Sequence, residues 1–149
     1  MENMGLELLF KGNNFLRLWG GLWITLRIAL ISMLFSLILG FFLGIIMRIK
    51  NPVLKVICRI YLEIVRIMPQ LVLLFLVYFG AAKHLGVNMS GEGAAVLVFT
   101  FWGTAEMGDL VRSALGAIPK HQYESSEALG MSRAQTYWYI IIPETVRRL

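Results

Sequence analysis

The side chains best suited to chemistry in this sequence are two carboxylic acids in an otherwise apolar stretch. Glu106 and Asp109 are three residues apart, so on a helix they share a face, where two acids could work as acid and base. Arg112, three residues further on, and Arg66 are candidate ion-pair partners. Charge in apolar surroundings is costly unless it is paired. This face therefore indicates either a polar route through the molecule or a structural ion pair.

The composition places these charges in a membrane protein. Of the 149 residues, 58% are hydrophobic and only 15% are charged, whereas soluble domains have roughly a quarter charged. The apolar residues also form long uninterrupted runs, which is typical of membrane helices. The net charge of +5 comes from basic residues beside these runs, where membrane topology explains them without a nucleic-acid partner. The single cysteine excludes an internal disulfide.

Three apolar segments are long enough to cross a bilayer as helices. The predicted spans are residues 28–47, 61–82 and 93–111. In the first, Gly40 and Gly44 predict close approach of another helix. In the second, Pro69 predicts a kink, and Glu63 and Arg66 have the spacing of an ion pair on one helix face. We expect an all-α membrane bundle in a single domain covering residues 1–149.

The distribution of lysine and arginine predicts how these spans are oriented. Four basic residues lie between the first and second spans, one between the second and third, and five after the third. Positive charge marks the cytoplasmic side, so we expect the amino terminus outside and the chain from Pro119 onward inside. Glu106 and Asp109 then lie near the inner boundary, where their carboxylates could also extend to the interface.

The rest of the sequence does not complete a catalytic site around the two acids. It supplies no nucleophile paired with a base and no set of metal ligands. The two histidines cannot meet, because His84 is predicted outside and His121 inside. No glycine-rich phosphate-binding loop occurs, so ATP must be hydrolysed by another chain. We therefore expect no enzymatic activity, no metal and no cofactor on this chain.

Residues 119–143, called the elbow below, predict a helix, a tight turn and a second helix. The first helix is expected over residues 121–129, ended by Gly130 in a left-handed conformation. Ser132 and Gln135 have the spacing of a capping box for the second helix, and Pro143 is expected to end it. Such a knob beneath a membrane could receive force from a soluble partner, or it could simply anchor the spans as an amphipathic hairpin.

The spacing within the elbow resembles the Glu-Ala-Ala loop of ABC-importer permeases. The matching positions are Glu124, Ser125, Ser126, Gly130, Ile140 and Pro143, with serines in place of both alanines and Ile142 in place of a leucine. Two further stretches are similar to the polar amino-acid importer family, and the resemblance covers about residues 20–149. These stretches are Tyr61-Leu-Glu-Ile-Val-Arg66-Ile-Met-Pro69-Gln-Leu and Ala105-Glu-Met-Gly-Asp109-Leu-Val-Arg112.

The resemblance implies a type I importer permease in the bacterial inner membrane. It implies that the six elbow positions couple the chain to ABC ATPase subunits, which use ATP. It further implies a solute-binding protein outside and a second permease subunit, identical or not. Asp109 and Arg112 fall in a recurring inner-end motif of the family. With Glu106 and Arg66, they are our candidates for the substrate path.

One departure from the family bears on function. Such permeases usually have five membrane helices, and this sequence stops at Leu149, where a fourth would begin. The resemblance therefore implies a carboxy-terminally truncated permease that lacks the last helices. The alternative hypothesis is a membrane remnant or assembly subunit that binds partners and transports nothing.

Overall fold

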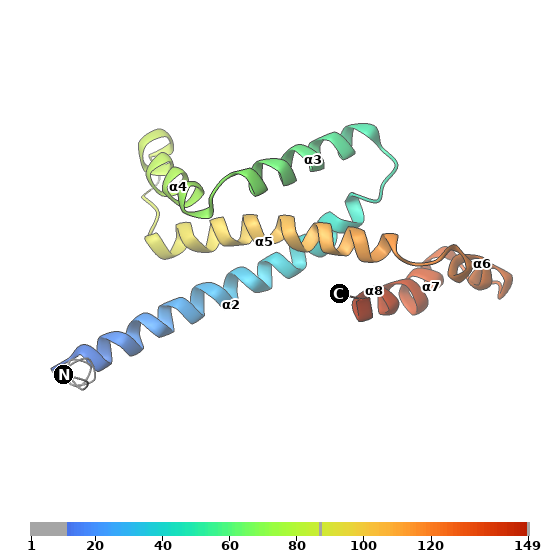
Figure 1. The fold of residues 1–149 in the computed structure, drawn as a ribbon, viewed down its shortest axis with the longest axis horizontal. Coiled ribbons are helices and arrows are strands. Elements are labelled where there is room, and N and C mark those ends of the chain that lie inside the picture. The colour runs from blue at the N-terminus through green and yellow to red at the C-terminus, as the bar shows by residue number, and fades with distance from the viewer. Residues whose placement is uncertain (1–11, 87, 149) are drawn as a thin grey trace, which may run out of the picture.

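The structure is a computed structural model that describes residues 12–86 and 88–148, and every regular element in those ranges is a helix. The elements are α2 (Asn14–Ile46), α3 (Pro52–Ile67), α4 (Gln70–Leu85), α5 (Gly91–Gly116), α6 (Lys120–Ala128), α7 (Arg133–Thr136), a π-helical turn η1 (Tyr137–Ile141) and α8 (Ile142–Arg148). In Figure 1, α3 and α4 lie to one side of α5, and the elbow helices gather at the end of α5.

The long helices α2 and α5 pack together and run in the same direction (Figure 1). Four small residues of α2, each four positions after the last, are buried against α5: Ser32, Ser36, Gly40 and Gly44. The serine hydroxyls donate hydrogen bonds to α5 carbonyls, Ser32 to Val96 O at 3.4 Å and Ser36 to Thr100 O at 3.3 Å.

The two glycines permit the closest approach between these helices. A Cβ at Gly40 would lie 2.5 Å from the Cβ of Met107, and a Cβ at Gly44 would lie 2.5 Å from the Cβ of Val111. Because real Cβ atoms do not approach so closely, only glycine fits at this separation. The close helix contact predicted from the glycine spacing is confirmed.

The second predicted span is broken rather than merely kinked. Helix α3 begins at a cap in which Asn51 Oδ1 accepts hydrogen bonds from the amides of Val53 and Leu54, at 2.9 and 3.4 Å. It ends before Pro69, and the following helix turns by 102°. Proline forces the preceding residue out of helical geometry, and Met68 is accordingly extended, at φ −81° and ψ 125°.

By length and composition, two described helices can each cross a membrane on their own, α2 and α5. The bent pair α3 and α4 makes a third span if its two parts are counted together. Helix α2 is longer than the expected first span and begins at Asn14. At about 1.5 Å per residue, its 33 residues reach about 50 Å, which exceeds the roughly 30 Å of a hydrocarbon core.

The elbow has the predicted turn. Gly130 has a φ of +73°, the left-handed conformation that glycine adopts without strain. Its amide donates to Glu127 O at 2.9 Å, and the amide of Met131 donates to Ser126 O at 3.0 Å. This pair of bonds is the Schellman pattern that closes a helix end.

The predicted capping box is also confirmed at the start of α7. The backbone amide of Gln135 donates to Ser132 Oγ at 3.3 Å, and the backbone amide of Ser132 donates to the side-chain Oε1 of Gln135 at 2.8 Å. Both ends of the turn between α6 and α7 are therefore held by local hydrogen bonds.

The prediction that Pro143 ends the second elbow helix is wrong. The chain stays helical through the π-turn η1 and on to Arg148 in α8. In the π-turn, the Ile142 amide reaches back five residues to Tyr137 O. Pro143 then stands in the first turn of α8, where its missing amide hydrogen and its ring are tolerated. The wider turn thus accommodates the proline within a continuous helix.

The elbow is anchored in a small apolar core at the end of α5. Ile141, with 0% of its surface exposed, packs with Val111, Leu115 and Ile118 of the α5 end. Next to it, the buried Thr145 hydroxyl donates to Ile141 O at 2.6 Å. The elbow is therefore packed directly against the end of α5.

Candidate functional site

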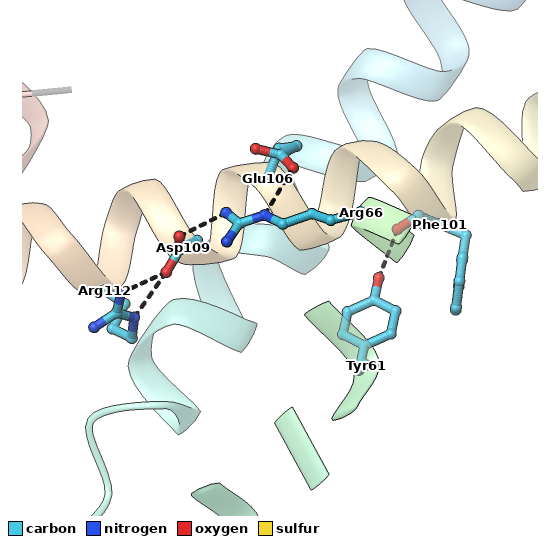
Figure 2. Close-up of polar contacts among 6 residues, drawn as sticks. All are labelled: Tyr61, Arg66, Phe101, Glu106, Asp109 and Arg112. Atoms are coloured by element: carbon cyan, nitrogen blue, oxygen red, sulfur yellow. Dashed lines mark hydrogen bonds and ion pairs between the residues drawn. The ribbon is translucent and has the colours of Figure 1, made fainter. Parts of the chain in front are cut away.

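Arg66, near the end of α3, reaches across to both acids of α5. Its Nη2 lies 2.7 Å from Asp109 Oδ2, and its Nε lies 3.3 Å from Glu106 Oε1 (Figure 2). Arg112 binds the other Asp109 oxygen, Oδ1, at 2.6 Å through Nη2 and 2.8 Å through Nε. The structure thus brings together all four side chains that were candidates for the substrate path.

Two arginines face two carboxylates in this network, so their formal charges cancel. The ion-pair interpretation of the two acids is confirmed in geometry. The pairing expected between Glu63 and Arg66 is wrong, because Glu63 binds Arg59 at 2.8 Å instead. Arg59 lies one turn earlier on the same side of α3 as Glu63, whereas Arg66 is drawn across to α5.

Three members of the network, Arg66, Asp109 and Arg112, line a hollow of about 320 Å³ between α3, α5 and the end of α2. It is lined by Met47, Lys55, Cys58, Arg59, Leu62, Glu63, Arg66, Asp109 and Arg112. Earlier in α3, the Tyr61 hydroxyl donates to Phe101 O at 2.5 Å, and the two rings meet edge to face (Figure 2). Tyr61 therefore helps to hold α3 beside α5. The only sign of this role in the sequence is that Tyr61 begins one of the two stretches that resemble the importer family.

The six positions predicted to couple the chain to an ATPase differ in their exposure to solvent. Glu124, Ser125, Gly130 and Pro143 are exposed, whereas Ile140 is partly buried and Ser126 is buried. Ile140 packs beside the core at the end of α5. Ser126 lies inside the elbow, so the small size of its side chain serves internal packing.

Two residues of the elbow that the sequence analysis did not select contribute to its geometry, Tyr123 and Thr136. Thr136 Oγ1 lies 3.0 Å from Ser126 Oγ, and the Ser126 hydroxyl donates to Tyr123 O at 2.7 Å. Thr136 lies ten residues from Ser126, so spacing alone gives no signal for it.

Tyr123 lines two hollows, one beside the end of α2 and one inside the elbow, of about 220 and 430 Å³. Burial raises the pKa of its hydroxyl above the ordinary value, and neighbouring Tyr137 raises it further, while Arg48 opposes the shift. The hydroxyl therefore stays neutral at physiological pH. Among the described residues, no group of three or more His, Cys, Asp or Glu side chains could hold a metal ion.

Comparison with known proteins agrees with this geometry. A family model described as "Binding-protein-dependent transport system inner membrane component" matches residues 36–149. The probable glutamine ABC transporter permease protein GlnP of Bacillus subtilis is 32% identical over 132 residues, covering 89% of this chain and 60% of the relative. The arginine ABC transporter permease protein ArtQ of Haemophilus influenzae is 32% identical over 95 residues, or 59% of this chain and 42% of the relative.

Two solved structures are also similar. A crystal structure of an amino acid ABC transporter with histidines has a TM-score of 0.72 at 26% identity, over 83% of this chain and 57% of that one. The MetNI methionine ABC transporter in an inward-facing conformation has a TM-score of 0.67 at 21% identity, over 100% of this chain and 68% of that one, which is a likeness of fold.

This chain spans at most 60% of the two relatives named above. The family model nevertheless covers most of its residues and includes all of the charged network and the elbow. The chain belongs to the family of inner-membrane components of binding-protein-dependent transport systems.

Proposed function

We propose that this chain is the transmembrane permease subunit of an ATP-driven ABC importer that carries a polar amino acid by alternating access. Support comes from the family and from relatives named as amino-acid ABC transporter permeases. ATP is hydrolysed by separate ATPase subunits on the cytoplasmic side. A solute-binding protein outside delivers the amino acid, and a second permease subunit completes the pathway.

The observation that carries this proposal is the construction of the elbow. Its turn is closed by Gly130 at positive φ, its second helix begins at a capping box, and buried Ile141 joins it to the end of α5. Glu124 and Ser125 remain exposed on the first helix, where a partner can bind them. A rigid, anchored and accessible knob of this kind is suited to transmit the motion of an ATPase to the spans.

We assign the charged network to the inner part of the substrate path. A polar amino acid carries a carboxylate and an ammonium group, and the network presents charges of both signs beside a hollow of about 320 Å³. The amino terminus lies outside, because the basic residues are concentrated at the opposite ends of the spans.

Gly130 provides the test of the coupling role. A valine at Gly130 would be strained at positive φ by about 1–2 kcal/mol, whereas asparagine tolerates that conformation better. No atom lies within 4 Å of a Cβ built there, so the cost is in the backbone. We expect Gly130→Val to lose uptake while ATP hydrolysis continues, and Gly130→Asn to retain most uptake.

The measurement is uptake of labelled amino acid and phosphate release in proteoliposomes that contain the permease, its ATPase and its binding protein. Wild-type uptake per ATP in Gly130→Val would contradict the coupling role of the elbow.

A further inference from the structure

Two buried hydroxyls face each other across the turn of the elbow. Ser126 in α6 is 1% exposed and Thr136 at the end of α7 is 6% exposed. Their oxygens are 3.0 Å apart, although ten residues separate them in the chain. This hydrogen bond joins two helices that are also connected through the turn at Gly130 and through the contact between the Tyr123 ring and that of Tyr137, directly after α7.

Each hydroxyl also has a partner within its own helix. The Ser126 hydroxyl donates to Tyr123 O at 2.7 Å, and the Thr136 hydroxyl lies 3.1 Å from Ser132 O. Removing one hydroxyl therefore leaves the other with a place for its proton, so neither loss creates a buried donor without an acceptor. The bond between α6 and α7 can thus be removed separately from the stability of either helix.

Ser126 has a second connection to the turn. Its carbonyl accepts the Met131 amide at 3.0 Å, the bond that closes the turn. One residue thus holds α6, the turn and α7 together, through its carbonyl on one side and its hydroxyl on the other. An alanine at this position would keep the turn bond and lose the cross-helix bond, together with the bond within α6 to Tyr123 O.

We infer that Ser126 and Thr136 form a clasp that sets the angle between the two arms of the elbow, which makes both of them positioning residues for energy coupling. This inference rests on the proposed coupling function. Force applied at exposed Glu124 and Ser125 on α6 passes through the clasp to α7. From there it passes to Ile141 and the end of α5. Without the clasp, α6 rotates about Gly130 and its rotation is not transmitted to α7.

The test uses near-isosteric variants in the complete transporter. Ser126→Ala and Thr136→Val each remove the clasp, whereas the matched control Thr136→Ser keeps the hydroxyl. The first readout is hydrogen exchange at the Gly130 and Met131 amides. Exchange should accelerate about five-fold in Ser126→Ala and in Thr136→Val, because one hydrogen bond contributes about 1 kcal/mol.

The second readout is uptake per ATP hydrolysed, together with the affinity of the permease for its ATPase. We expect both clasp variants to lose uptake per ATP at unchanged ATPase affinity. The double variant should lose no more than either single variant, since both remove the same bond. Thr136→Ser should behave as the unaltered protein.

Wild-type uptake per ATP in both Ser126→Ala and Thr136→Val would overturn the clasp, as would additive losses or an equal loss in Thr136→Ser. These outcomes are distinguishable from failure of the proposed function itself. If the elbow does not couple at all, Gly130→Val also leaves uptake per ATP unchanged. If only the clasp is wrong, Gly130→Val uncouples while the clasp variants do not.

Discussion

Asp109 is the residue at which two helices are joined by charge. One of its carboxylate oxygens pairs with Arg66 of α3, and the other pairs with Arg112 of its own helix. Glu106 is tied to the network only through Arg66 among the described contacts. Arg66 is therefore the residue whose loss disconnects α3 from both acids, while Asp109 keeps Arg112.

We expect Arg66→Gln to destabilise the protein by on the order of 1 kcal/mol, because the paired groups are partly exposed and solvent screens them. Arg59→Gln is the matched control. It removes an exposed pair within α3, in which Arg59 lies 2.8 Å from Glu63, and should cost less stability than Arg66→Gln. Unfolding in detergent measures both free energies. Equal losses in the two variants would show that the bridge from α3 to α5 adds nothing.

At the scale of elements, the contact between α2 and α5 organises the fold. It depends on small side chains at every fourth position of α2, which let the two backbones approach. The serines of this stripe also donate hydrogen bonds to α5 carbonyls. The broken pair α3 and α4 connects these helices, so α5 can run in the same direction as α2.

A methyl group at Gly44 should separate the two helices. It would meet the Cβ and Cγ1 of Val111 at 2.5 and 2.6 Å and the backbone oxygen of Gly108 at 2.8 Å, so the backbone must move. We expect Gly44→Ala to cost about 1–3 kcal/mol of stability, as for overpacked cores. Gly20→Ala in the same helix has no atom within 4 Å and should be neutral or slightly stabilising.

Thermal unfolding of both variants in one detergent makes this comparison. A Gly44→Ala protein as stable as Gly20→Ala would mean that the close approach of α2 and α5 is unimportant for folding.

At the scale of the whole molecule, the described helices place the loop before α5 and the elbow at opposite ends of α5 (Figure 1). Arg27 of α2 and Glu92 of α5 pair at 3.8 Å toward the end that holds this loop. If α5 crosses the membrane, the loop and the elbow must lie on opposite sides of it. We propose, from the distribution of lysine and arginine, that the elbow lies on the cytoplasmic side.

Cysteine labelling tests this orientation. In a Cys58→Ala background, a membrane-impermeant maleimide should label Asn88→Cys in intact cells. Ser125→Cys, exposed on α6, should react only after the cells are permeabilised. Labelling of Ser125→Cys in intact cells would place the elbow outside and end the proposed coupling to a cytoplasmic ATPase.

The features of this protein that sequence determined are those whose energetics are local. The left-handed turn at Gly130 and the capping box of Ser132 and Gln135 depend on residues that are neighbours in the chain. The position of the interruption at Pro69 is local for the same reason, although the sequence predicted a kink there and not a turn of 102°. Backbone sterics and short-range hydrogen bonds decide such features wherever the segment lies.

Other features depend on which segments meet in space, and only the tertiary structure decided them. Arg66 pairs with Glu106 and Asp109, which are 40 and 43 residues away in the chain. It does not pair with nearby Glu63, because α5 presents two carboxylates together. Ser126 is interior because α7 folds back over it. Pro143 stays within a helix because the preceding π-turn widens the backbone, while buried Ile141 and Thr145 hold that segment against the core. Packing between distant segments outweighed the local preference at each of these positions.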